Sequence, residues 1–458
     1  MATTFTDQDV INVLKEFYDG QEVSSLLGRN SPVLEKIEKR RVGGKEYPVP
    51  YLTSGSGAVC ADFSKVKAGV ARWGKTDRAS VGYNSIFSSF TVSLKEMEAA
   101  KKDAGSFVDL IMLKSFSALD GLRKVFGLSL YGKGDGFIGS NTVAIATGNQ
   151  TITVNNYSAA GVDLGTQIVI ADKDGTLIPS YNPTITAIER GDSTSVLTLS
   201  DVIPSITQIE IGEGSIYIDG CGTPDSPLLP VGLDAWLPTV ADRTGDTWNT
   251  YIKKAFFGVD RSKYTARLAG NFVKQGAGEK IADCVVRLLQ RIRTAGGVPD
   301  MVVMNPEDYN TMISELGEQL KLMQNINTAD KKSKNEVVRG ISDFKFAFAT
   351  SWLEYVIDDP LCPKGKVYII DQKKFKFISL SNVTPIVNAE TNNVNPGAPE
   401  IVKTSKAPDQ YNLNFDDFCT VQPFDLPDGP GFMATFRIFG NFILTAPAHC
   451  GVAVLNAA

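Results

Sequence analysis

The spacing of apolar residues predicts helices in several parts of the chain. Residues 96–127 carry apolar side chains at helical spacing, so we expect one long helix there. A stripe from Ile281 to Ile292 predicts a second helix. A third is expected over residues 6–19, where Thr6 and Asp9 form a capping pattern. These helices occur between extended stretches, which predicts a mixed α+β fold.

Alternating residues predict a long hairpin in the first quarter of the chain. Two extended stretches, 58–71 and 79–94, flank a polar tip that contains Arg72, Trp73 and Arg78. The hairpin has little apolar surface, and an isolated two-stranded ribbon is marginal in water. We therefore expect it to be ordered by another surface, with Trp73 as an anchor. The alternative is a pair of strands inside a local sheet.

Residues 141–219 have a different composition, dominated by Thr, Val, Ile, Asn and Gly in short alternating runs. This predicts a small all-β module inserted into a larger domain. A G-x-G-x-x-G match at Gly134, Gly136 and Gly139 precedes it, but a helix comes before the glycines and a strand-like run follows. A dinucleotide site needs the opposite order, so we interpret these glycines as a turn.

The second half of the chain shows shorter signals. A buried strand is expected at Met301–Met304, and the Asn305-Pro306 turn should start a helix over Tyr309–Leu316. Further strands are expected at 344–349, 367–370 and 433–444.

Composition and charge exclude several classes of function. The chain has 458 residues and a net charge of −5, which disfavours a nucleic-acid binder with a large basic footprint. Its single histidine, His449, excludes sites built on paired histidines. The six cysteines are scattered, as in a reducing compartment. We find no catalytic, metal or cofactor site, no apolar run long enough for a membrane helix, and no secretory signal in the first ten residues.

One basic run stands out against this acidic background. A short helix should start at Ser31-Pro32 and end in the run from Lys36 to Arg41. These cations either contact nucleic acid or complement the dipole at the helix C-terminus; the second is the simpler interpretation.

The order of these elements resembles the major capsid proteins of tailed bacteriophages, which have the HK97-type fold. The resemblance rests on the long hairpin, the long helix, the glycine turn Gly134-Asp135-Gly136 and the Asn305-Pro306-x-x-Tyr309 turn. It also includes Asp358-Asp359-Pro360 and the last long strand with Arg437. The insertion at 141–219 lies outside it.

The resemblance implies an HK97-like α+β fold with a spine helix, an extended E-loop hairpin, an A-domain and a P-domain, plus the inserted small all-β domain. It divides the chain into an N-terminal arm (1–45), the E-loop hairpin (46–95), a P-domain part with the spine helix (96–140), the insertion (141–219), the A-domain (220–390) and a C-terminal part that returns to the P-domain (391–458). E-loop residues expected to contact a neighbouring subunit are Lys65, Lys67, Arg72, Trp73, Lys75 and Arg78. Asn305, Pro306 and Tyr309 form the expected A-domain turn.

The implied function is structural and not enzymatic. Pentamers and hexamers of the chain would form the icosahedral head around double-stranded DNA, which they would contact weakly and without sequence specificity. The expected partners are a portal protein, a scaffolding protein and decoration proteins, with assembly in the host bacterial cytoplasm, a location in the virion capsid and no membrane. Two alternatives stay open: an encapsulin-type compartment shell, and an enzyme or glycan-binding protein with its site in the β module.

Overall fold

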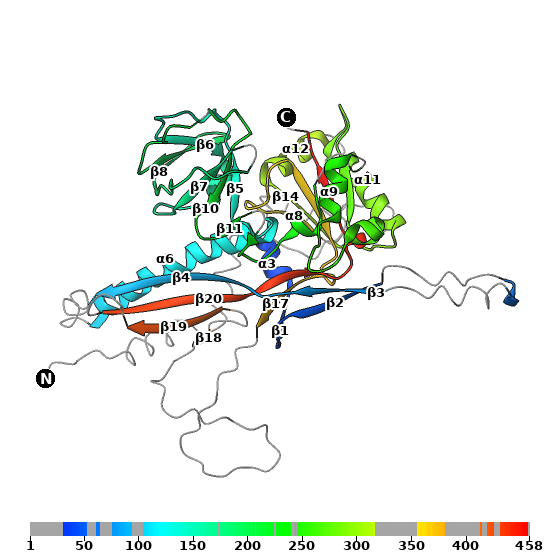
Figure 1. Cartoon of the computed structure of the whole chain (residues 1–458), viewed down its shortest axis with the longest axis horizontal. Coiled ribbons are helices and arrows are strands. Elements are labelled where there is room, and N and C mark those ends of the chain that lie inside the picture. Colours follow the sequence, from blue (N-terminus) through cyan, green and yellow to red (C-terminus); the bar gives the residue numbers. More distant parts are fainter. Residues whose placement is uncertain are drawn as a thin grey trace, which may run out of the picture.

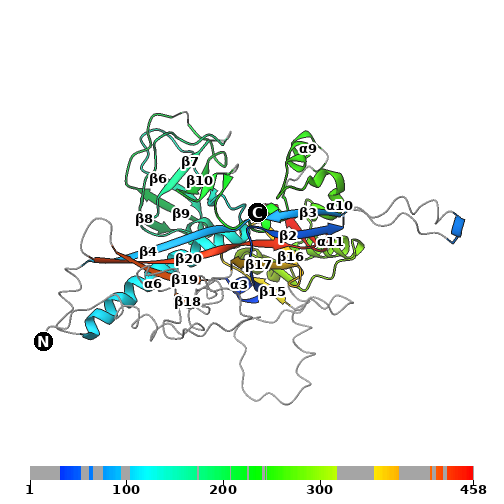
Figure 2. The ribbon, with the colours of Figure 1, turned by 60° about the horizontal axis from the view of Figure 1, so that its bottom comes forward.

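The computed structural model describes residues 31–52, 61–64, 76–93, 104–172, 175–206, 208–223, 226–239, 243, 245–316, 355–380, 413–414, 419–425 and 431–456. A long sheet forms the floor of the molecule, and two compact bodies stand on one side of it (Figure 1). A two-stranded ribbon continues the line of the sheet to the right. Figure 2 shows the same two bodies, separate from each other, from a second direction. The predicted mixed α and β class is confirmed. The expected helix at 6–19 and strand at 344–349 lie outside the described residues.

The long sheet is organised around β20 (Gly431–Leu444). Every second residue of this strand points to the same face, and from Ala434 to Leu444 that face is fully buried or glycine. The other strands are β4 (Asn84–Ser93), which pairs with β20 over its whole length, and β1 (Glu38–Val42), β17 (Phe375–Leu380), β19 (Cys419–Asp425) and β18 (Leu413–Asn414). The sheet therefore joins segments from both ends of the chain.

The long helix α6 (Ala104–Tyr131) packs on the buried face of this sheet. Phe126 makes the central contact, with ring centroids 5.1 Å from Phe377 and 5.6 Å from Phe442. The helix continues four residues beyond the predicted end at 127 and stops at the glycine turn.

The glycine turn after α6 leads the chain into residues 137–219. Gly134 and Gly136 have φ of +86° and +74°, and a side chain at Gly134 would lie 2.6 Å from the carbonyl oxygen of Leu229. Only glycine fits both requirements without strain. A helix precedes these glycines and a strand follows, which is the predicted order and the reverse of the order in a dinucleotide-binding motif.

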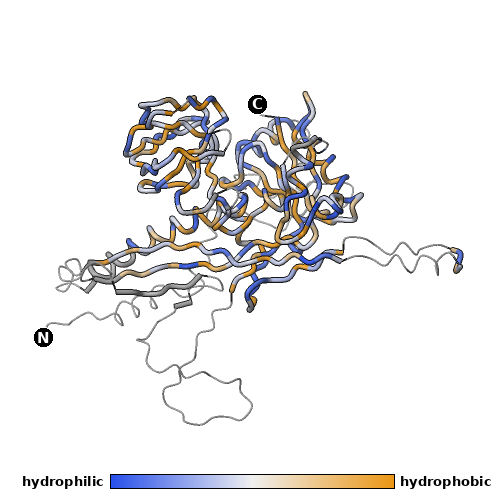
Figure 3. The backbone as a smooth tube through the Cα atoms, viewed as in Figure 1, coloured by the Kyte–Doolittle hydropathy of each residue, from blue (hydrophilic) through white to orange (hydrophobic). Residues whose placement is uncertain are grey.

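The β-module, residues 137–219, has its own apolar core, and Val125 and Leu128 of α6 pack against it. It contains two three-stranded sheets: β5 (Phe137–Ser140), β10 (Ser215–Ile218) and β7 (Ile168–Ala171), and β6 (Thr151–Asn155), β9 (Thr194–Leu199) and β8 (Ile185–Arg190). The structure differs from the predicted all-β module at 141–219 in two respects. β5 begins before residue 141, and one short helix, α7 (Asn156–Ala160), interrupts the strands. Figure 3 shows the apolar residues spread along these strands.

The second body is built on a five-stranded sheet. Its order is β13 (Asn271–Lys274), β21 (Gly451–Val454), β16 (Lys366–Ile370), β14 (Met301–Met304) and β15 (Tyr355–Asp358). Helix α11 (Ile281–Thr294) covers it with the predicted apolar stripe and packs beside α12 (Pro306–Leu316). The remaining short elements are α3 (Pro32–Lys36), β2 (Tyr47–Leu52), β3 (Thr76–Val81), β11 (Gly222–Thr223), β12 (Ser226–Pro227), α8 (Leu233–Trp236), α9 (Asp246–Lys253), η1 (Arg261–Tyr264), α10 (Thr265–Leu268) and η3 (Pro447–His449).

Three strands lie in a different part of the fold from the predicted one. β21 completes the five-stranded sheet of the second body, although residues 391–458 were assigned as one part that returns to the P-domain. β17 lies in the long sheet, although residues 220–390 were assigned to the A-domain. β1 is a strand of the long sheet and not the end of a helix. The chain crosses between the two sheets more often than its local patterns indicate, because strand pairing is decided by partners far away in sequence.

Candidate assembly interface

The ribbon of β2 and β3 is anchored in the body by one face. Val49, Tyr51, Ala79 and Val81 alternate with exposed residues and are buried in the main core. The hydroxyl of Tyr51 donates a hydrogen bond to the carbonyl oxygen of Leu444 at 2.7 Å, and burial raises the pKa of this phenol well above its usual value. The hydroxyl therefore stays protonated and keeps this bond over the physiological pH range.

Contacts from the second body hold the same ribbon. The backbone N–H of Ser80 donates to the carbonyl oxygen of Phe257 at 3.0 Å, and Arg267 donates to that of Leu52 at 3.0 Å. Phe257 in turn stacks on Trp236, with ring centroids 5.5 Å apart. The base of the ribbon therefore has a fixed direction relative to both sheets.

Beyond this base, the described residues 61–64 stand well away from the body (Figure 1). Asp62 caps the turn by accepting from the backbone N–H of Ser64 at 3.0 Å. Phe63 is 80% exposed, and Leu52 at the end of β2 is 57% exposed. A single exposed apolar side chain is ordinary on a protein surface, so Phe63 is notable for its place on a projecting segment and not for its exposure alone. Phe63 was not among the predicted contact residues; its signal in the sequence is an aromatic residue between two capping residues, Asp62 and Ser64.

The predicted hairpin strands differ from the observed ones. The ribbon pairs 47–52 with 76–81, while most of the expected return strand is β4, which belongs to the long sheet. Phe63 and Ser64 are helical, although 58–71 was expected to be extended. Lys65, Lys67, Arg72, Trp73 and Lys75 lie outside the described residues. Arg78 is exposed on β3, opposite Pro50, and its contact with a neighbour stays a prediction.

The Asn305-Pro306 turn fastens two loops of the second body together. The Asn305 side-chain oxygen accepts from the N–H of Glu307 at 3.0 Å, and its amide donates to the carbonyl oxygen of Cys362 at 2.8 Å. Pro306 begins α12, where its missing N–H costs nothing. Tyr309 is half-buried against the core under α11. The turn thus stabilises the fold of the second body from within.

A buried carboxylate joins three distant segments beside this turn. Asp359 Oδ2 accepts from the hydroxyl of Ser31 at 2.5 Å and from that of Tyr131 at 2.7 Å. Its Oδ1 accepts from the N–H of Leu361 at 2.9 Å. Burial raises the pKa of Asp359 despite these hydrogen bonds. We call this cluster of Ser31, Tyr131 and Asp359 the joint, because it ties the segment before β1 and the end of α6 to the second body.

A second buried carboxylate lies near the joint and is paired with cations. Asp234 accepts from Lys366 Nζ at 2.9 Å, and Lys133 Nζ lies at 3.7 Å. Burial alone would raise the pKa of Asp234, but the two lysines outweigh it and the pKa is lowered. This ion pair links the glycine turn to β16 and stays charged at neutral pH.

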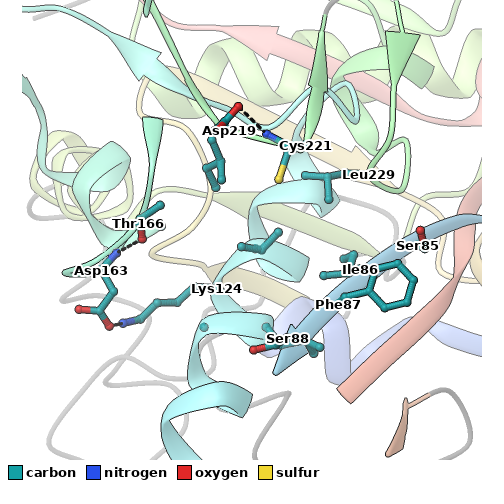
Figure 4. A pocket seen from close by; sticks show the side chains of 16 residues that line it. Ser85, Ile86, Phe87, Ser88, Lys124, Asp163, Thr166, Asp219, Cys221 and Leu229 are labelled. Atoms are coloured by element: carbon teal, nitrogen blue, oxygen red, sulfur yellow. Dashed lines mark hydrogen bonds and ion pairs between the residues drawn. The ribbon is translucent and has the colours of Figure 1, made fainter. Parts of the chain in front are cut away.

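A cavity of about 430 Å³ lies where the β-module meets β4 and α6. Figure 4 shows Lys124 reaching across to Asp163, at 2.5 Å, on one side, with Cys221 and Leu229 on another. Burial raises the pKa of the Cys221 thiol to about 11, so it is a protonated and poor nucleophile at neutral pH. His449 lies away from this cavity, half-buried in η3.

The described residues show no metal centre and no membrane helix. Among them, no group of three or more His, Cys, Asp or Glu side chains is placed to hold a metal ion. Within the same residues no helix is long and apolar enough to cross a bilayer.

No family model and no curated protein matches the chain. Several solved structures that it resembles come from phages, a capsid or an encapsulin. One is the capsid of Cyanophage A-1(L), with 14% identity and a TM-score of 0.40 over 93% of this chain and 92% of that chain. A chain from Mycobacterium phage Adephagia has 12% identity and a TM-score of 0.37, over 100% and 99%. The holo-SrpI encapsulin complex from Synechococcus elongatus PCC 7942 has 7% identity and a TM-score of 0.40, over 99% and 96%. Similarities of this size show no family, and the function has to come from the surfaces of the chain itself.

Proposed function

We propose that the chain is the major capsid protein of a tailed bacteriophage. Copies of it would assemble into the pentamers and hexamers of an icosahedral head that encloses double-stranded DNA. The observation that carries the proposal is the ribbon: its base is held by the long sheet and by the second body, and residues 61–64 project from the body with Phe63 exposed.

Such a ribbon supports assembly for a geometric reason. When an arm of one subunit lies on a different surface of the next, the contact is head-to-tail, and a repeated head-to-tail contact closes into a ring. A fixed base with a projecting end allows rings of five and six to form from the same contact. The expected portal, scaffolding and decoration proteins belong to the same proposal.

The test measures particle mass by analytical ultracentrifugation and negative-stain microscopy, with the chain expressed alone or with a scaffolding protein. We expect closed shells of megadalton mass. DNA inside native particles would support a phage head, whereas an enzyme cargo would point to an encapsulin-type compartment. A chain that stays monomeric with a scaffold present would contradict the proposal.

A pair of substitutions tests the ribbon itself. Phe63→Ser should reduce the yield of particles at least about fivefold, because it removes an apolar contact at the centre of an interface. The matched control is Leu164→Ser, since Leu164 is 61% exposed on the β-module. Equal particle yields from the two variants, with both monomers folded by circular dichroism, would argue against the ribbon as an assembly contact.

A further inference from the structure

Strand β4 has one open edge. It pairs with β20 on one side, and among the described residues no strand pairs with it on the other. In an antiparallel pair, every second residue turns its N–H and C=O away from the partner strand. The carbonyl oxygen of Thr91 accepts from Lys114 Nζ at 2.9 Å, which places Thr91 in this outward set. Because the register with β20 is continuous, Ser85 and Phe87 belong to the same set.

The outward backbone groups of Ser85 and Phe87 are unpaired. None of the backbone hydrogen bonds that the described residues form outside the regular ladders involves them. Sheet edges are commonly protected by a charged residue, a proline or a bulge. Lys114 covers the edge at Thr91, but residues 85–88 read Ser-Ile-Phe-Ser and carry none of these devices.

The edge of the five-stranded sheet shows how the same chain closes an edge strand. Among the described residues β13 pairs with β21 alone. Arg291 and Arg287 of α11 donate to the carbonyl oxygens of Phe272 and Lys274 of β13, each at 2.6 Å. Two acceptors of that strand are therefore occupied from within the chain, whereas those of β4 at residues 85–88 stay available.

This open edge lines the cavity of about 430 Å³ beside the β-module (Figure 4). The volume falls within the range of about 300–1,000 Å³ that is typical of ligand pockets. The apolar part of the wall consists of Ile86, Leu122, Val125, Ile218 and Leu229. Because α6 and the β-module enclose the edge on two further sides, a single chain segment can reach it, but the sheet edge of a folded body cannot.

One carboxylate of the cavity has no cation. Asp219 accepts from the side-chain amide of Asn182 at 3.0 Å and from the N–H of Gly220 at 2.9 Å, and it forms no ion pair with any described residue. The other carboxylate of the lining, Asp163, is already paired with Lys124. Asp219 is half-buried, so a Lys or Arg that a ligand brings there would gain a charge-assisted hydrogen bond.

We propose that this cavity binds an extended, basic segment of a second protein, which adds a strand to the open edge of β4. Unpaired N–H and C=O groups along a strand are matched by another extended backbone. The edge from Ser85 to Ser88 is about 10 Å long and engages about four residues of the segment. Side chains of a strand alternate, so every second residue of the segment faces the apolar wall, and a Lys or Arg pairs with Asp219.

The first test uses peptides and the unassembled full-length wild-type chain. A fluorescein-labelled peptide of about nine residues, in which Val alternates with Thr and Lys, serves as the strand. Two further peptides carry N-methyl groups, one on every Val and the other on every Thr and Lys. Since only one set of N–H groups faces β4, one methylated peptide should bind roughly tenfold more weakly by anisotropy and the other should bind like the parent.

The second test changes the cavity itself. Ser85→Pro removes one outward N–H, and an edge strand tolerates proline where the N–H points outward. We expect about fivefold weaker binding of the parent peptide, while the matched control Ser85→Ala, which keeps the N–H, binds like wild type. Asp219→Asn should weaken binding of the Lys peptide by up to about fivefold, but not that of a peptide with Gln in place of Lys.

Three results would overturn the proposal. Equal binding of the parent and both methylated peptides would show an apolar pocket without strand addition. Absence of saturable binding would show that the cavity is no docking site. Binding confined to a peptide of this chain's own residues 62–70 would show that another copy, and not a second protein, fills it. The methylated peptides decide the matter even if Ser85→Pro fails to fold, and none of these measurements depends on the formation of shells.

Discussion

Single polar residues, more than apolar ones, determine how the parts of this molecule meet. Asp359 is fully buried and holds the hydroxyls of Ser31 and Tyr131, from segments 328 and 228 residues away. No sequence pattern places these three residues together, because each is ordinary in its own segment. The Asp358-Asp359-Pro360 turn was noticed in the sequence, but its partners were not predictable.

The first prediction concerns the joint. Asp359→Ala should lower the free energy of unfolding by roughly 2–4 kcal/mol, since each stranded buried donor costs about 1–3 kcal/mol. Asp359→Asn should cost less, because its amide keeps one acceptor and its N–H groups can donate to the two hydroxyl oxygens. Urea unfolding followed by tryptophan fluorescence measures both. An Ala variant as stable as wild type would show that the joint does not hold the segments together.

Comparing the wild type with Asp359→Asn also gives a pH dependence of stability with a definite sign. The folded-state pKa of Asp359 is raised above its unfolded value, so the folded chain binds the proton more tightly. This contribution to stability is largest below the unfolded pKa and is lost as the pH rises through the raised folded pKa. The wild-type minus Asp359→Asn difference in unfolding free energy should therefore decrease as the pH rises through that window. A constant difference would contradict the direction of the shift.

At the scale of elements, local sequence patterns predicted the positions of helices and strands better than they predicted which strands pair. α11 and β14 lie where their apolar spacing placed them, because short-range periodicity decides both. The alternation over 79–94 correctly indicates extended chain, but β4 pairs with β20, more than three hundred residues later. At β1 the type of element was predicted wrongly. Its Lys and Arg residues favour a helix, but pairing with β17 overrides that preference.

Close packing at the centre of β20 gives the second prediction. A side chain at Gly440 would lie 2.3 Å from Phe377 Cζ and 2.5 Å from the carbonyl oxygen of Ile378. Gly440→Ala should therefore destabilise the fold by about 1–3 kcal/mol, as overpacked cores do. Gly82→Ala is the control, since nothing lies within 4 Å of its added carbon. Calorimetry on both variants checks this, and equal melting temperatures would refute it.

At the scale of the whole molecule, the chain enters and leaves the β-module at one place. The chain enters at Gly136 and leaves near Ile218, whose N–H donates to the carbonyl oxygen of Gly136 at 2.9 Å. The inserted domain at 141–219 stays a prediction, made from an abrupt change in composition. β5 lies before residue 141 and pairs with β10, a match that exists only in three dimensions.

The last prediction uses this boundary. A chain in which a short Gly-Ser linker replaces 137–219 should keep one cooperative thermal transition, because insertions with adjacent ends can be removed without breaking a core. Removing only 141–219 should leave a less soluble protein, since Ile138, buried in the wild type, loses its cover. Calorimetry and size-exclusion chromatography compare the two. Loss of the transition in the longer deletion would show that the module is part of the main fold.

The straight line formed by the ribbon, β4 and β20 has a mechanical consequence. A neighbour that pulls on the projecting end applies tension along the strands, since the ribbon continues their direction (Figure 1). Tension in that direction shears the β4–β20 ladder, so every pair from Gly431–Ser93 to Gly440–Asn84 resists at once. A pull across the strands would open the same pairs one after another. The molecule is thus stiffest along this axis, which in the proposed shell is the axis on which a stretched wall would load it.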